Sequence, residues 1–111
     1  MIKLINESTS RFTSNPKFID PALRSFPYGS LIDFKREIDE DGSVNEYYIY
    51  KIKNPKFFSE YKNTQDFLEI FGISDRYYGE IGPGGRYETY FVDYFPGKGI
   101  AILNVYSALN I

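Results

Sequence analysis

The sequence of 111 residues contains no histidine, no cysteine and no tryptophan, and these absences exclude much chemistry. Without cysteine there is no thiolate nucleophile and no disulfide, and without histidine there is no Ser-His-Asp triad and no imidazole base. The same absences remove the zinc and haem ligand sets that need sulfur or imidazole. We therefore expect no metal and no cofactor, and any function must rest on carboxylates, hydroxyls, amines and aromatic rings.

Long apolar runs and an excess of positive charge are also missing. The longest apolar run, residues 99–105, has the length of a strand and not of a membrane span. The apolar start, residues 1–5, is too short for a signal peptide, because Asn6 and Glu7 end it. A net charge of -2 offers no electrostatic footprint for nucleic acid or an anionic membrane. These features favour a cytoplasmic protein that binds neither.

Aromatic residues are abundant, with 11 tyrosines and 10 phenylalanines, and many stand in alternating patterns typical of strands. Residues 31–38 and 44–52 alternate and are joined by the turn-forming segment 39–43, which contains Asp-Gly, so they predict a hairpin. Residues 86–95 and 99–107 predict a second hairpin, with Pro96 and Gly97 at the centre of a type II turn. Residues 99–107 are apolar on both faces, which predicts a strand covered on each side.

Helix signals are shorter and lie mainly between the two hairpins. Asn63 or Thr64 caps a predicted helix over 64–71, whose apolar stripe ends at Gly72. A second short helix is expected over about 55–61 and a third around 16–25, each after an Asn-Pro pair. We therefore predict an α+β fold in one domain, residues 1–111. It is a mainly antiparallel sheet of two hairpins (about 31–52 and 86–107), with one or two short helices (about 55–61 and 64–71) packed on one face.

The acidic turn of the first hairpin resembles the start of a calcium-binding loop. Residues 37–44 place carboxylates at alternate positions before Gly42, as an EF-hand loop does, with Glu37 in place of the leading aspartate. However, Tyr48 stands where the bidentate glutamate belongs, and the flanking residues predict strands and not helices. We interpret the turn as a solvated hairpin tip without a metal.

The favoured hypothesis is a small acidic, non-enzymatic protein-binding module. Its most concrete form is an inhibitor or immunity protein that neutralises one basic, nuclease-like toxin partner, because carboxylates steer a cationic protein and tyrosines anchor it. We expect phenylalanines mostly inside and several tyrosines at the surface. The predicted partner-binding residues are Asp39, Glu40, Asp41 and Glu46 for charge, and Tyr47, Tyr77 and Tyr78 for contact area.

Two other hypotheses stay open. A small enzyme or carbohydrate-binding domain would use tyrosines and paired carboxylates, and it predicts a concave, tyrosine-lined pocket that holds two acids, at least one with a raised pKa. A subunit of a homo-oligomer with a structural role would instead show a mass above that of the monomer, which is 12.9 kDa.

Overall fold

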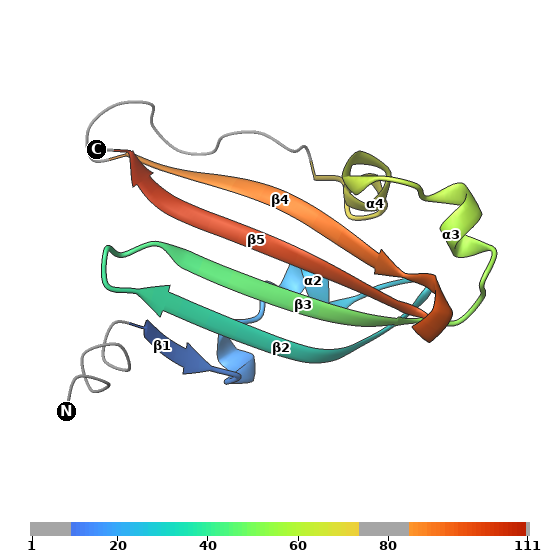
Figure 1. Ribbon diagram of the computed structural model, residues 1–111, viewed down its shortest axis with the longest axis horizontal. Helices are drawn as coiled ribbons and strands as arrows, with labels where there is room; N and C mark the ends of the chain where they lie inside the picture. Colours follow the sequence, from blue (N-terminus) through green and yellow to red (C-terminus); the bar gives the residue numbers. More distant parts are fainter. Residues whose placement is uncertain (1–9, 74–84, 111) are drawn as a thin grey trace.

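The computed structural model describes residues 10–73 and 85–110, which form one five-stranded antiparallel sheet with short helices (Figure 1). The strand order is β1-β2-β3-β5-β4, so the segment after β3 crosses to the far edge of the sheet. In chain order the elements are β1 (Ser10–Thr13), η1 (Pro16–Phe18), α2 (Pro21–Arg24), β2 (Gly29–Asp39), β3 (Val44–Ile52), α3 (Phe57–Glu60), α4 (Thr64–Ile70), β4 (Gly85–Phe95), η2 (Pro96–Lys98) and β5 (Ile100–Asn110).

The predicted α+β class and both hairpins are confirmed. β2 pairs with β3 and β4 pairs with β5, each antiparallel, and the helix over 64–71 corresponds to α4. The predicted segment 16–25 is split into η1 and α2, because Pro21 starts a second helix behind its own cap, Asp20. β1 was not predicted. Its four residues carry no alternating signal, and they form a strand only because they pair with the last residues of β2.

The two hairpin turns use glycine in different ways. Gly42 has φ 88° in the turn between β2 and β3, as the Asp-Gly pair predicts. The turn between β4 and β5 is not the expected type II turn. Pro96 begins a 3-10 turn, and Gly99, not Gly97, takes the left-handed conformation. Proline fixes the φ that the 3-10 turn needs, and Gly99, three residues after Pro96, ends the turn in the left-handed conformation.

The hydrophobic core lies on one face of the sheet. Figure 1 shows the strands passing in front of α2, with α3 and α4 beside the β4 edge. Alternate strand residues pack here against side chains of the helical segments, in a cluster that includes Leu23, Phe26, Phe34, Tyr48, Tyr50, Phe57, Phe67, Leu68, Ala101 and Leu103. We call this side of the sheet the helix face.

Two tyrosines are central to that core beside the buried phenylalanines, whereas we expected phenylalanines mostly inside and several tyrosines at the surface. Tyr48 and Tyr50 are both 0% exposed, whereas Phe12 is 69% and Phe91 is 57% exposed. Burial is tolerated because both hydroxyls have partners. Tyr50 Oη donates to the Leu23 carbonyl at 2.7 Å, and Tyr48 Oη accepts the Asp20 N–H at 3.0 Å.

The opposite side of the sheet carries apolar residues that are outside the core. Charged and polar residues lie among them, and we call this side of the sheet the open face. The register places on it Asp33, Lys35, Glu37, Tyr47, Ile49, Lys51, Phe91, Asp93, Ile102, Asn104 and Tyr106. In residues 10–73 and 85–110 no helix covers them. Within the described part of the chain, the cover that we expected on both faces of β5 is therefore found on the helix face and not on the open face.

Candidate functional site

The tip of the β2–β3 hairpin is held by Ser43, which bonds to two of its carboxylates. The Ser43 hydroxyl donates to Asp41 Oδ1 at 2.7 Å and to Asp39 Oδ2 at 3.2 Å, and the Ser43 N–H donates to Asp41 Oδ1 at 2.9 Å. These bonds, the backbone N–H first, hold the pKa of the Asp41 carboxyl below its ordinary value. The tip therefore keeps its negative charge in a defined geometry.

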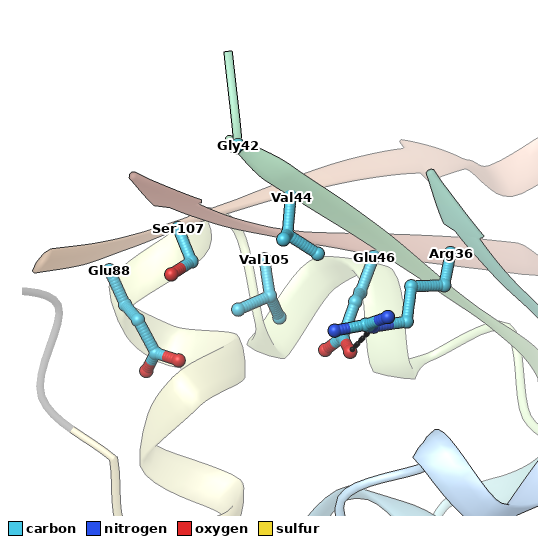
Figure 2. Close-up of a pocket in the computed structure, with 7 residues that line it drawn as sticks. All are labelled: Arg36, Gly42, Val44, Glu46, Glu88, Val105 and Ser107. Atoms are coloured by element: carbon cyan, nitrogen blue, oxygen red, sulfur yellow. Dashed lines mark hydrogen bonds and ion pairs between the residues drawn. The ribbon is translucent and has the colours of Figure 1, made fainter. Parts of the chain in front are cut away.

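Beside the tip, the helix face has a hollow of about 320 Å³ whose described lining comes from the strands and the β2–β3 turn. Figure 2 shows its lining side chains on one side of the sheet, with Val105 between Glu46 and Glu88. The strand register explains this arrangement, because Glu46 pairs with Val105, and Ser107 on the next row pairs with Glu88. The lining residues are Arg36, Gly42, Val44, Glu46, Glu88, Val105 and Ser107.

Glu46 is the most constrained carboxylate of the hollow. Arg36 Nε donates to its Oε2 at 3.2 Å, and the Tyr48 hydroxyl donates to its Oε1 at 3.3 Å. Burial raises the pKa of Glu46 above its ordinary value, and the nearby charge of Glu88 adds to this, although Arg36 and Tyr48 act in the opposite direction. The negative charge of Glu46 is therefore incompletely compensated by its neighbours.

Glu88 supplies a second carboxylate, and among the side chains that the structure describes none forms an ion pair with it. It accepts a hydrogen bond from the Tyr90 hydroxyl at 3.0 Å. The described lining thus combines two carboxylates with the guanidinium of Arg36 around the apolar side chains of Val44 and Val105. A group with an alkyl stem and a cationic end, as in lysine or arginine, fits this combination of an apolar floor and an acidic rim.

The structure brings together only part of the predicted partner-binding set. Asp39, Glu40 and Asp41 lie at the tip and Glu46 lies in the adjacent hollow. Tyr47 is on the open face, because neighbouring strand residues point to opposite sides of a sheet. Tyr77 and Tyr78 lie outside the described residues.

Arg36, Glu88 and Ser107 line the hollow but do not belong to the predicted partner-binding set. Arg36 and Glu46 belong to the two alternating segments that predict the first hairpin. If the facing ends of these segments, Ile38 and Val44, are paired, Arg36 lies opposite Glu46, as the structure has it. Glu88 could not be placed in this way, because its position depends on β5 standing between β3 and β4.

Among the described residues, no group of three or more carboxylates could hold a metal ion together. None of the helices in residues 10–73 and 85–110 is long and apolar enough to cross a membrane.

Comparisons of the chain with protein-family models, with curated proteins and with solved structures find no match.

Proposed function

We propose that this chain is an acidic, non-enzymatic protein-binding module that inhibits one basic protein partner, a nuclease-like toxin being the most concrete candidate, in the cytoplasm. The observation that carries the proposal is the hollow beside the hairpin tip, with Glu46 and Glu88 around an apolar floor. A lysine or arginine of the partner would place its stem on Val44 and Val105 and its charge between the two carboxylates.

The tip carboxylates support the same function in a different way. Glu40 and Asp41 are exposed and lie next to the hollow, which Gly42 of the same turn lines. Exposed charges of one sign attract a cationic protein over a distance of about 10 Å at ordinary salt, and they raise the association rate more than the final affinity. In this proposal the tip steers the partner and the hollow holds it.

Charge-reversal variants test the proposal by capture from a lysate of the source organism. The immobilised protein should retain one strongly basic protein, identified by mass spectrometry, and should inhibit its activity at a ratio of one to one. Glu88→Lys and Glu40→Lys should each weaken retention by about tenfold or more, since each places a cation where the partner brings one. Glu69→Lys is the matched control, because Glu69 is exposed on α4 and does not line the hollow.

Two outcomes would argue against a basic partner. One is that no protein is retained, and the other is that the retained protein binds all three variants as well as it binds the unchanged chain. Retention that falls equally in all three variants would indicate general charge attraction and not a site at the hollow.

A carbohydrate-active function has one observation in its favour. The hollow does hold two carboxylates, and burial raises the pKa of Glu46, as that hypothesis requires. Its described lining includes no tyrosine, however, so the stacking surface that a sugar ring needs is missing there. Calorimetric titration with soluble oligosaccharides checks this alternative. Binding that Glu88→Gln abolishes would favour it over the protein-binding proposal.

A further inference from the structure

The open face is large enough for a stable protein interface. β2, β4 and β5 each have 11 residues and β3 has nine. With about 3.4 Å per residue and about 4.8 Å between strands, these four strands present roughly 700 Å² on one side of the sheet. An interface of standard size takes about 800 Å² from each partner. The face thus matches the contact area of one partner or one second copy.

The composition of the open face is also that of an interface. Its centre is apolar, because Ile49 pairs with Ile102 across β3 and β5 and Tyr47 lies beside them. Phe91 of β4 is 57% exposed on the same side. Asn104, the polar residue nearest the centre, has its amide group bonded to Asn45 Oδ1 and to the Glu46 carbonyl, both at 3.2 Å. A protein surface that covers Asn104 would therefore leave no N–H donor of its side chain without a hydrogen bond.

The charges on the open face favour a second copy of this chain over a basic protein. Both signs are present, with Asp33, Glu37 and Asp93 negative and Lys35 and Lys51 positive, so the face is of mixed charge and is not an acidic patch of the kind that attracts a cationic partner. Asp33 and Lys35 are two residues apart on β2 and point to the same side. When β2 of a second copy lies over the first in the opposite direction, Asp33 of each copy faces Lys35 of the other, so opposite charges meet.

We propose that the open faces of two copies pack against each other and form a two-fold symmetric β-sandwich. The two-fold axis lies in the plane midway between the two sheets and runs perpendicular to the strands. Along the strands, it is positioned between the row of paired residues that contains Lys35 and Tyr47 and the row that contains Asp33 and Ile49. Each strand then lies over its own equivalent in reverse order, within the angle of about 30° that aligned sheets adopt. Lys35 of each copy meets Asp33 of the other, and Tyr47 meets Ile49.

The alternative two-fold arrangement, with the axis parallel to the strands, is disfavoured by the same residues. It would place β2 of one copy over β4 of the other without reversing the residue order. Asp33 and Asp93 occupy the same level, since they pair with Ile49 and Ile102, which pair with each other. Two aspartates would therefore face each other at both edges of the interface, which costs binding energy.

A charge swap tests the pairing through the mass of the purified protein, measured by light scattering and by sedimentation at about 100 μM. The unchanged chain should have twice the monomer mass, which is 12.9 kDa. Lys35→Glu and Asp33→Lys should each weaken self-association about tenfold or more, because each creates two like-charged contacts. The double variant, Asp33→Lys with Lys35→Glu, should restore the dimer because it re-forms both opposite-charge contacts. Lys53→Glu, an exposed change outside the open face, should have no effect.

Three results would overturn the proposal. The first is a monomer mass for the unchanged chain at all concentrations tested. The second is a dimer that neither single variant weakens, since another surface would then form it. The third is that the unchanged chain is a monomer that captures a basic protein, and that the Lys35→Glu variant no longer captures it. This result would assign the open face to the basic partner. Circular dichroism of each variant verifies that it is folded. Failure of the pairing leaves the acidic hollow untouched, because the hollow is on the helix face.

Discussion

Two tyrosines of the helix face differ in a single hydrogen bond, and the difference predicts opposite effects of the same substitution. Tyr50 Oη donates to the Leu23 carbonyl at 2.7 Å, whereas Tyr94 Oη is buried without a partner among the described residues. Tyr50→Phe should lower the free energy of unfolding by about 1–2 kcal/mol, because the Leu23 carbonyl loses its donor. Tyr94→Phe should raise it, by up to about 1 kcal/mol, because an unpaired polar atom leaves the interior. Urea unfolding followed by circular dichroism measures both, and equal effects would contradict the assignment.

Two carboxyl groups near the hollow predict opposite pH dependences of stability. The pKa of Glu46 is raised from 4.5, so its contribution to the free energy of unfolding is largest below pH 4.5 and is lost as pH rises through the raised pKa. The free energy of unfolding of Glu46→Gln, relative to the unchanged chain, should therefore increase between about pH 4 and pH 7. The pKa of Asp41 is lowered from 3.8, so Asp41 stabilises the fold above pH 3.8 and this contribution is lost on acidification.

Asp41→Asn is the comparison that makes this pH prediction specific. Its free energy of unfolding relative to the unchanged chain should decrease as pH rises from about 3 to 5, which is the reverse of the trend for Glu46→Gln. Unfolding curves at four or five pH values provide the measurement. The same direction for both variants would show that net charge, and not the local environment of each carboxyl, controls the pH dependence.

At the scale of elements, the sequence predicted most of the strands because their local signals agree with their pairing. Residues 44–52 alternate and become β3 with the same bounds, and Asn63 caps α4 as expected, its Oδ1 accepting the Asp66 N–H at 2.8 Å. β1 and the crossover to β4 had no such signal, since both depend on contacts between residues distant in the chain. The candidate site was found only in part for the same reason. Glu46 belongs to a predicted strand, whereas Glu88 reaches the hollow through the strand order.

One hydrogen bond joins α4 to the edge of the sheet and predicts how strongly the helix is attached. The Val92 N–H donates to Thr64 Oγ1 at 3.0 Å, so the first residue of α4 satisfies a backbone group of the edge strand β4. Thr64→Val keeps the shape of the side chain but removes the acceptor. We expect a loss of about 1–2 kcal/mol in the free energy of unfolding. Thr64→Ser keeps the hydroxyl and should lose less. A Thr64→Ser variant as unstable as Thr64→Val would assign the effect to the lost methyl group instead.

At the scale of the whole molecule, a group of carboxylates and a group of lysines lie at opposite ends of the β2–β3 hairpin. The carboxylates of the tip and hollow lie at one end of the β2–β3 hairpin, while Lys51, Lys53, Lys56 and Lys98 lie near the other end, where Lys51 Nζ donates to the Lys98 carbonyl. The nine residues of β3 separate the two ends by roughly 30 Å, which is about three Debye lengths at ordinary salt. A cationic partner approaching the tip is therefore little affected by the lysines.

Pairing of the open faces would leave both acidic ends accessible, because the reversed strands place them at opposite ends of the dimer. This arrangement predicts a stability that depends on concentration, since unfolding is then coupled to dissociation. With an unfolding enthalpy of about 0.7 kcal/mol per residue, a hundredfold increase in protein concentration should raise the Tm of the dimer by about 6 °C. Thermal unfolding followed by circular dichroism, from about 5 to 500 μM, measures the shift. The Tm of Lys35→Glu should depend little on protein concentration, and the concentration dependence should return in the charge-swapped double variant. A Tm that is constant over this range in the unchanged chain would mean that the folded unit is the monomer.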